Sequence, residues 1–434
     1  MATINPAGAV AAPAAYAGTR ATTVRWRIFA VVFVLVVINL IDRTALSVAM
    51  PTISKEFALG PAMTGVILSA FFWTYAFLQV PGGWLIDKFG PRKLITFSTL
   101  AWGGFQTLAG FAPGGITLLA TRLGLGVAEA PLFPAGAKLS SGWLSPSERG
   151  RGAVLMDSGA PLGAAFGGLI ISYLILGLGS WRSAFVAAGV ATAALGAVAW
   201  RYLRDNPHEH PRVNAAELAQ IEGAPRSDGT QTQPAAPSRI VGSSIAALLT
   251  GRMAWAMINF GLLTWGPSYL AQARGLDLKQ MGNATFVIFL AGMAGSLTGG
   301  FLADALVRRG FRRALVYKTL LAISGLATLA SFLALPVVAS SAVAVAILSG
   351  TLFFLYWGSL YWSLPTLLAP RSKVGILGGL MNFAGSSSGI AVPIITGLIL
   401  QWTGAYAAAL YFFAGCAGLY VLATLFIGFP SEAR

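Results

Sequence analysis

Charged residues are scarce in this chain of 434 residues: lysine, arginine, aspartate and glutamate together make up 10% of it. Soluble globular proteins carry about 25%, so the composition excludes an ordinary soluble protein. Hydrophobic residues make up 56% of the chain. Apolar stretches of about 20 residues recur along the whole sequence, and each is long enough to cross a bilayer as a helix. Because backbone polar groups must be paired inside a bilayer, we expect an all-α membrane protein.

Cysteine and histidine are almost absent. The single cysteine, Cys416, falls in an apolar stretch, so no intrachain disulfide can form. His208 and His210 lie in a polar loop without a carboxylate or thiol cluster, which argues against a metal site. The sequence also lacks the G-x-x-x-x-G-K-[ST] loop that binds ATP phosphates, a paired nucleophile and base, and a large polar domain. We therefore expect a protein that is not an enzyme, with no catalytic residues and no cofactor.

Twelve apolar spans are expected, joined by short polar loops. Their approximate bounds are 27–50, 61–86, 93–111, 115–138, 152–178, 181–201, 245–272, 281–306, 313–335, 341–368, 374–400 and 404–428. A long polar stretch separates the first six spans from the last six. The predicted organisation is a disordered cytoplasmic N-terminal lead (1–26), a six-helix bundle (27–201), a cytoplasmic linker (202–244), a second six-helix bundle (245–428) and a cytoplasmic tail (429–434).

The formal charge of +15 is spread over many short loops. It therefore indicates membrane topology rather than nucleic-acid binding. If both termini are cytoplasmic, few basic residues remain in the loops on the opposite side: Lys55, Arg182, Arg274 and Lys279. This asymmetry predicts a multi-pass protein of an inner (cytoplasmic) membrane with both termini inside.

A loop motif occurs once in each set of six spans. Residues 83–93 read GWLIDKFGPRK, and residues 300–313 read GFLADALVRRGFRR. This repeated G-x-L-x-D…G-x-[RK]-[RK] pattern resembles the signature loop of the major facilitator superfamily. The resemblance implies two six-helix bundles around a central cavity, with substrate bound near the midplane. It also implies gating of the cytoplasmic side by charge pairs of these loops, although a solvated basic turn is the alternative. The gating candidates are Asp87, Arg92, Asp304 and Arg312.

Four ionisable residues fall deep inside expected spans: Asp42 and Arg43 in the first, Arg122 and Glu129 in the fourth. A charge at the bilayer centre costs at least about 2.5–3.5 kcal/mol, so such residues face a partner or a wet cavity. Arg122 and Glu129 are seven residues apart and share a helical face. We expect Arg122 level with Asp42 and Arg43, and Glu129 nearer the midplane. Protonation of either acid would leave a positive cavity suited to an anion; a static network of buried ion pairs is the alternative.

Polar and aromatic side chains in other spans are candidates to line the same cavity. They are Asn39, Tyr75, Ser359, Trp362 and Asn382. Asn382 stands out, because an amide in the middle of a span needs a polar partner. Each aromatic residue could instead serve packing or anchoring at the membrane interface.

The chain resembles more narrowly the anion:cation symporter family, which includes bacterial porters for galactonate, glucarate and hexuronates. The matching segments are NLIDR at 39–43, FFWTY at 71–75, RLGLGVAE at 122–129, NPHEHP at 206–211 and GGLMN at 378–382. The resemblance implies that Asp42 and Glu129 couple protons, that Arg43 binds the substrate carboxylate, and that Arg122 links them. Tyr75, Trp362 and Asn382 match positions that line the sugar-acid pocket.

The function implied by this resemblance is secondary active transport. The expected carrier imports a small organic anion, a sugar acid or related carboxylate, by proton symport with alternating access. Organic-anion exchange, with structural intramembrane acids, is the alternative. In the fifth span residues 158–161 read SGAP, where the galactonate porters carry a polar residue, so a smaller or more aromatic acid also fits. Its expected partners are the substrate, protons and the lipid bilayer, and we expect a monomer that binds no nucleic acid.

Overall fold

The computed structural model describes residues 20–145, 148–222, 242–370 and 373–429. These residues form helices joined by short turns and contain no strand. The predicted lead (1–26) and tail (429–434) fall, apart from residues 20–26 and 429, outside the described residues.

The first half of the chain forms seven helices. They are α1 (Val24–Glu56), α2 (Pro61–Phe89), α3 (Pro91–Ala109), α4 (Gly115–Glu129), α5 (Leu132–Trp143), α6 (Arg149–Leu178) and α7 (Trp181–Tyr202). The fourth expected span is divided between α4 and α5, because α4 ends two residues before Pro131. The connection to the second half contains a short 3₁₀ turn, η2 (Pro207–Glu209), and the helix α8 (Ala215–Glu222).

The second half repeats this plan with more irregular helices. They are α9 (Gly242–Ser268), continued by the π-helical η3 (Tyr269–Ala273), α10 (Leu278–Arg308), α11 (Arg313–Ala334), continued by η4 (Leu335–Val337), α12 (Ser341–Leu355), η5 (Tyr356–Ser363), α13 (Leu364–Leu368), α14 (Val374–Thr403) and α15 (Tyr406–Phe426). The tenth expected span comprises α12, the 3₁₀ segment η5 and α13.

The structure confirms the all-α membrane fold. Among the described residues, eleven helical spans are long and apolar enough to cross a membrane. The remaining expected span, 93–111, is α3, which is more polar and buries Thr99 and Gln106. It packs closely along α7, since a Cβ at Gly103 would lie 2.7 Å from the Ala193 backbone nitrogen. Close backbone approach of this kind is typical of membrane helix pairs.

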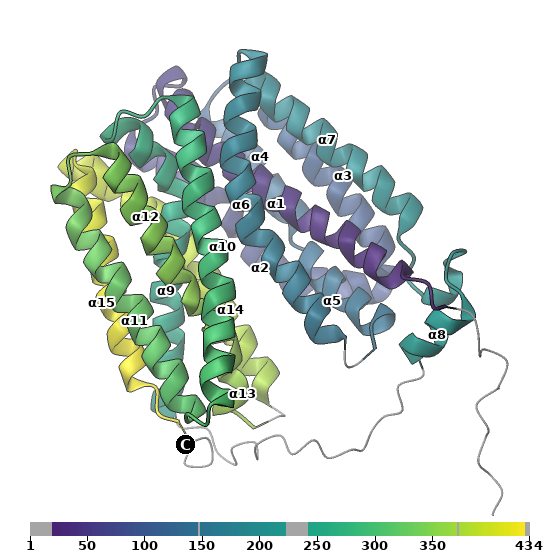
Figure 1. Cartoon of the computed structure of the whole chain (residues 1–434). Coiled ribbons are helices and arrows are strands. Elements are labelled where there is room, and N and C mark those ends of the chain that lie inside the picture. The colour runs from purple at the N-terminus through teal and green to yellow at the C-terminus, as the bar shows by residue number, and fades with distance from the viewer. Residues whose placement is uncertain (1–19, 146–147, 223–241, 371–372, 430–434) are drawn as a thin grey trace, which may run out of the picture.

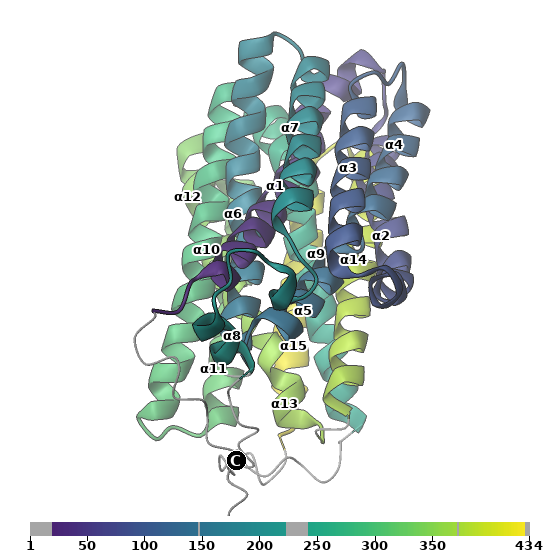
Figure 2. The same cartoon turned by 90° about the vertical axis from the view of Figure 1, so that its right-hand side faces the viewer.

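The helices form two groups, α1–α7 and α9–α15 (Figure 1). We use "linker side" for the end of the molecule that carries α8, the start of α1 and the end of α10, and "far side" for the opposite end. The two groups draw together at the far side and diverge towards the linker side (Figure 1). Figure 2 shows α8 at the linker side, near α5.

Small residues make the contact between the groups at the far side. Along α6 and α10, a Cβ at Gly168 would lie 2.6 Å from Thr285 Cγ2, and one at Gly282 would lie 2.6 Å from Ser172 Cβ. Along α2 and α14, a Cβ at Gly397 would lie 2.5 Å from the Pro61 carbonyl oxygen. At these positions the helix backbones themselves approach closely. The rings of Phe166 of α6 and Phe286 of α10 add an edge-to-face contact between the halves at 5.3 Å.

The linker is fastened to the first turn of α1 by Glu217 of α8, which is completely buried. Its carboxylate accepts hydrogen bonds from the backbone nitrogens of Val24 and Arg25, both at 3.0 Å. It also accepts one from Thr22 Oγ1 at 2.5 Å and forms an ion pair with Arg25 at 3.1 Å. Glu217 therefore caps a transmembrane helix from a segment about 190 residues away in sequence, satisfying backbone donors that the helix leaves free.

Replacing Glu217 with glutamine is expected to lower the free energy of unfolding by about 1–3 kcal/mol, because an amide NH₂ would face buried donors. The midpoint of thermal unfolding in detergent measures this loss. Glu222→Gln is the matched control in the same helix, since Glu222 is 59% exposed and pairs with His208 at the surface. We expect that variant to stay within about 0.5 kcal/mol of the wild type. Equal shifts in the two variants would contradict the capping role.

Candidate functional site

An ion pair buried in the first half lies at the centre of the candidate site. Arg43 Nε of α1 donates to Glu129 Oε2 of α4 at 2.8 Å. The side chain of Glu129 is completely buried, and that of Arg43 is 11% exposed. Asn39, one turn before Arg43, is also buried and lies beside Glu129. A charged pair at this depth is retained at a desolvation cost, which marks it as a functional candidate.

Two stacked aromatic rings of α2 support the guanidinium of Arg43. Its Cζ lies 4.2 Å from the ring centroid of Phe71 and 4.4 Å from that of Tyr75. The two rings stack at 5.1 Å. Helices α2 and α4 approach closely here, because Thr74 Oγ1 donates to the Leu123 carbonyl oxygen at 2.7 Å. The arrangement holds a planar cation by ring contacts on one side and by Glu129 on another.

Arg122 belongs to the same region but has different partners. It is 2% exposed, and its Nη2 donates to Gln106 Oε1 of α3 at 3.1 Å. Its charge interacts with both Asp42 and Glu129. Arg122 thus interacts with both buried acids, and the linking role that the sequence implies for it stays a prediction.

Asp42 faces a different part of the bundle from its neighbour Arg43. Its Oδ2 accepts hydrogen bonds from Trp102 Nε1 of α3 at 3.0 Å and from Thr192 Oγ1 of α7 at 2.9 Å. Successive residues of a helix project about 100° apart, so Asp42 points into the bundle while Arg43 points to its edge. The four charges, which were expected to group together, thus have separate partners. Arg43 and Glu129 form an ion pair, Arg122 is hydrogen-bonded to Gln106, and Asp42 is hydrogen-bonded to Trp102 and Thr192.

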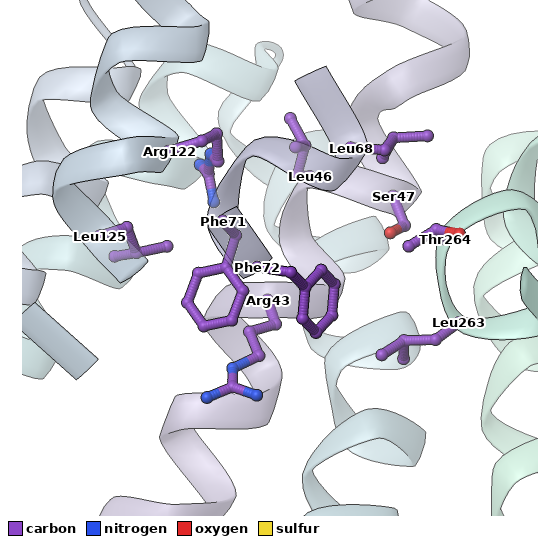
Figure 3. Close-up of a pocket in the computed structure, with 10 residues that line it drawn as sticks. All are labelled: Arg43, Leu46, Ser47, Leu68, Phe71, Phe72, Arg122, Leu125, Leu263 and Thr264. Atoms are coloured by element: carbon purple, nitrogen blue, oxygen red, sulfur yellow. The ribbon is translucent and has the colours of Figure 1, made fainter. Parts of the chain in front are cut away.

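A narrow pocket opens beside the ion pair and is lined by residues of both halves. Figure 3 shows Arg122 on one side of the pocket and Leu263 and Thr264 of α9 on the opposite side. The rings of Phe71 and Phe72 lie between them, and the guanidinium of Arg43 lies below the rings. The remaining lining residues are Leu46, Ser47, Leu68 and Leu125. Two cations, a hydroxyl pair and apolar walls can hold a small anion.

The predicted residues of the second half lie apart from this pocket. Trp362 and Ser359 belong to η5, and Asn382 belongs to α14. Trp362 is 43% exposed, and its ring stands over Arg252 of α9, with the Arg252 Cζ 5.0 Å from the ring centroid. The sequence analysis did not single out Arg252. The structure places it ten residues into α9, where it is 8% exposed.

The gating candidates lie at the linker side, each within its own half. Asp87 pairs with Lys138 at 2.8 Å, and both side chains are more than half exposed. Arg92 donates to the Trp200 carbonyl oxygen at 2.8 Å, which ties the start of α3 to the end of α7. Asp304 and Arg312 are exposed near the turn between α10 and α11. Their role in closing this side stays a prediction.

Within the described residues there is no group of three or more histidine, cysteine, aspartate and glutamate side chains that could hold a metal ion. The buried acids are instead partnered by arginine, tryptophan and threonine.

Two groups of six membrane spans that meet around a charged pocket are the architecture of a secondary transporter. The chain belongs to the Major Facilitator Superfamily, whose sequence model matches residues 32–393. The chain is a multi-pass membrane transporter rather than an enzyme.

Curated relatives match the chain over most of its length. The probable galactarate/D-glucarate transporter of Escherichia coli is 33% identical, covering 91% of this chain and 92% of that protein. The probable sulfoacetate transporter of Cupriavidus necator is 34% identical, covering 93% and 94%. The hexuronate transporter of Bacillus subtilis is 31% identical, covering 90% of each.

Among solved structures, a bacterial homologue of the human lysosomal transporter Spinster has a similar fold. In its inward-facing and occupied conformation it superposes with a TM-score of 0.72 at 17% identity, covering 94% of this chain and 97% of that one. This likeness supports the fold of the chain.

Proposed function

We propose that the protein imports a small organic acid, a sugar acid or a related carboxylate, together with protons across a bacterial inner membrane. The buried ion pair between Arg43 and Glu129, on the wall of a pocket between the halves, carries this proposal. Relatives whose names refer to galactarate, glucarate, sulfoacetate and hexuronates support the class of substrate. We further propose a monomer with both termini in the cytoplasm, so that the linker side faces the cytoplasm.

Glu129 is the proposed switch between the loaded and empty pocket. While it is ionised, it occupies the guanidinium of Arg43. A proton taken up by Glu129 removes the negative charge and leaves Arg43 free to bind a carboxylate through two parallel hydrogen bonds. The net charge of the loaded pocket then equals that of the empty one, which keeps the cost of rocking the halves low.

Asp42 and Arg122 form the proposed second part of the relay. Asp42 is held by Trp102 and Thr192, away from the pocket, and interacts with Arg122 through charge. Arg122 interacts with Glu129 as well. A change of protonation at either acid therefore alters the field at the other, and the two acids respond as a coupled pair.

Release follows from the orientation that we propose. The halves diverge towards the linker side (Figure 1), which would open the pocket to the cytoplasm. The higher cytoplasmic pH favours proton loss from Glu129, the Arg43–Glu129 pair forms again, and the carboxylate is displaced. The gating loops around Asp87 and Asp304 would close this side in the opposite conformation.

Uptake into proteoliposomes tests the proposal. A labelled panel of galactarate, galactonate, glucarate, glucuronate, sulfoacetate and an aromatic carboxylate is offered with an inward proton gradient, with and without a protonophore. We expect at least one acid to accumulate with the gradient and not with the protonophore. Accumulation that ignores the gradient and requires an internal anion would identify an exchanger, in which Asp42 and Glu129 are structural.

A further inference from the structure

Gln106 is a completely buried amide in the last turn of α3. Buried polar side chains need hydrogen-bond partners, and Gln106 has one in Arg122 of α4. Arg122 Nη2 donates to Gln106 Oε1 at 3.1 Å. The relay that we propose for protons uses Arg122, Asp42 and Glu129 but gives Gln106 no part, so this contact calls for an explanation of its own.

Two successive turns of α3 hold an acid and a cation of the relay. Trp102 lies four residues before Gln106, which places the two side chains on one face of α3, about 6 Å apart along its axis. Trp102 Nε1 donates to Asp42 Oδ2 of α1 at 3.0 Å, whereas Gln106 accepts from Arg122 of α4. The same face of α3 therefore fixes Asp42 and Arg122 relative to each other.

Helix α3 is itself fixed against α7. The two helix backbones approach closely at Gly103, where a Cβ would lie 2.7 Å from the backbone of α7. From α7, Thr192 Oγ1 donates to Asp42 at 2.9 Å, and the ring centroid of Phe185 lies 5.5 Å from Arg122 Cζ. Asp42 and Arg122 are thus both held by α3 and α7 together, and α3 holds Arg122 through the amide of Gln106.

The hydrogen bonds of this network are incomplete. Within the part of the chain that the structure describes, three fully buried atoms of the network have no hydrogen-bond partner: Gln106 Nε2, Arg122 Nε and Asp42 Oδ1. Two of them are donors and one is an acceptor. A network that serves packing alone pairs its buried polar atoms. Spare donors and a spare acceptor on these residues leave the network able to exchange hydrogen bonds when an acid gains or loses a proton.

We propose that Gln106 is a positioning residue for proton coupling, which holds the Arg122 guanidinium so that it serves Asp42 and Glu129 together. This inference rests on the proposed function. The Gln106 amide is neutral, so it fixes the place of Arg122 without neutralising its charge, as a carboxylate there would. That charge interacts with both acids. A proton taken up by one acid is therefore felt at the other, because both face the same cation.

Gln106→Leu tests this role, because leucine fills a similar volume but accepts no hydrogen bond. A buried guanidinium without a partner is costly, so we expect Arg122 to close on one of the two acids and to keep it ionised. Substrate accumulation driven by the proton gradient should then fall by about tenfold or more, the effect of one hydrogen bond to a charged group. Counterflow of substrate, which needs no net proton movement, should stay close to that of the wild type.

Gln106→Glu should move the pH dependence of uptake in the direction opposite to Gln106→Leu. The cations that face the two acids are Arg43 and Arg122, and the hydrogen-bond donors to Asp42 from α3 and α7 are neutral. Gln106→Glu adds a negative charge beside Arg122, which favours protonation of Asp42 and Glu129. We expect the pH of half-maximal uptake to rise by about one unit, and to fall in Gln106→Leu, where Arg122 keeps one acid ionised. Initial uptake rates over a range of external pH measure both shifts.

Thr99→Val is the matched control on the same helix. Thr99 is completely buried in α3, and its hydroxyl donates to the Ile95 carbonyl oxygen of that helix at 2.7 Å. The substitution removes a buried polar group without touching a charge, so uptake should depend on the proton gradient and on pH as in the wild type. The midpoint of thermal unfolding in detergent, measured for each variant, shows that the protein is folded.

Two outcomes would overturn the positioning role while sparing the proposed function. One is a Gln106→Leu variant whose accumulation and pH dependence match those of the wild type. The other is an equal loss of accumulation and counterflow with an unchanged pH dependence, as a purely structural amide would give. If Gln106→Leu does not fold, the pH dependence of Gln106→Glu decides alone, and the absence of a shift there overturns the role. Failure of the wild type to accumulate any organic acid with the gradient would instead refute the proposed function, and this inference with it.

Discussion

Replacing Glu129 with glutamine is expected to abolish proton-driven accumulation of the substrate while leaving exchange of substrate across the membrane intact. Glutamine has nearly the same shape but cannot carry a proton, so uptake no longer depends on the gradient. Arg43 keeps its aromatic support from Phe71 and Tyr75 and can still bind a carboxylate. The measurement compares gradient-driven uptake with counterflow in proteoliposomes made from the same preparation.

Glu56→Gln is the matched control for this prediction. Glu56 also pairs with an arginine, Arg182, at 2.8 Å, but it is 43% exposed at the far side and lies outside the pocket. We expect its uptake to follow the proton gradient as in the wild type. Loss of both uptake and counterflow in Glu129→Gln, with an unchanged unfolding midpoint, would mean that Glu129 serves substrate binding rather than proton coupling.

Replacing Arg43 with lysine is expected to lower uptake at low substrate concentration by about 10- to 100-fold, although the charge is retained. The ammonium group makes no two-pronged contact with a carboxylate and stacks less well on the rings of Phe71 and Tyr75. Loss of one hydrogen bond to a charged group, worth about 1.5–3 kcal/mol, corresponds to a factor of this size. Initial uptake rates over a range of substrate concentrations measure the change.

The far side offers a control with the same chemistry outside the pocket. Arg182 pairs with Glu56 and lies over Trp181, with its Cζ 4.3 Å from the ring centroid. Arg182→Lys is expected to transport within about twofold of the wild type, since partly exposed ion pairs contribute little. Normal uptake by Arg43→Lys would remove Arg43 from the substrate site and favour a purely structural ion pair.

Most of the fold could be predicted from the sequence, because length and hydropathy decide whether a helix can cross a bilayer. The least apolar span, 93–111, was also predicted correctly. Its helix, α3, buries polar residues such as Gln106 against other helices rather than exposing them to lipid. The interruption of the fourth span near Pro131 and the 3₁₀ segment η5 were not predicted, since they depend on how neighbouring helices pack.

The sequence analysis predicted which charged residues lie inside the membrane spans, and it predicted part of their arrangement. The depth of the charges could be estimated from the rise of a helix, and a carboxylate did meet an arginine. The direction of each side chain could not be estimated, because it depends on the rotation of α1 against α3, α4 and α7. Asp42 and Arg43 are adjacent in sequence, yet Asp42 binds Trp102 and Thr192 while Arg43 binds Glu129.

Arg252 shows the limit of the positive-inside rule when it is applied by counting. Seven residues into an expected span, an arginine can reach the membrane surface with its long side chain, so its place in the sequence does not mark it as buried. In the structure it turns inwards, towards Trp255 and Trp362. Tryptophan three residues later in the same helix, at 255, was the sequence signal that could have indicated this direction.

The far side closes by contact between helix backbones at small residues such as Gly168, Gly282 and Gly397. Such a seal carries no charge, so dissolved salt has nothing to screen there. The linker side is expected to close by ion pairs between exposed loops, and these weaken as ionic strength rises. The far side would thus close by the packing of helix backbones, and the linker side by ion pairs. If the linker side faces the cytoplasm, as we propose, a rise in cytoplasmic ionic strength is expected to shift the balance between the two conformations of the carrier with no change in substrate or proton gradient.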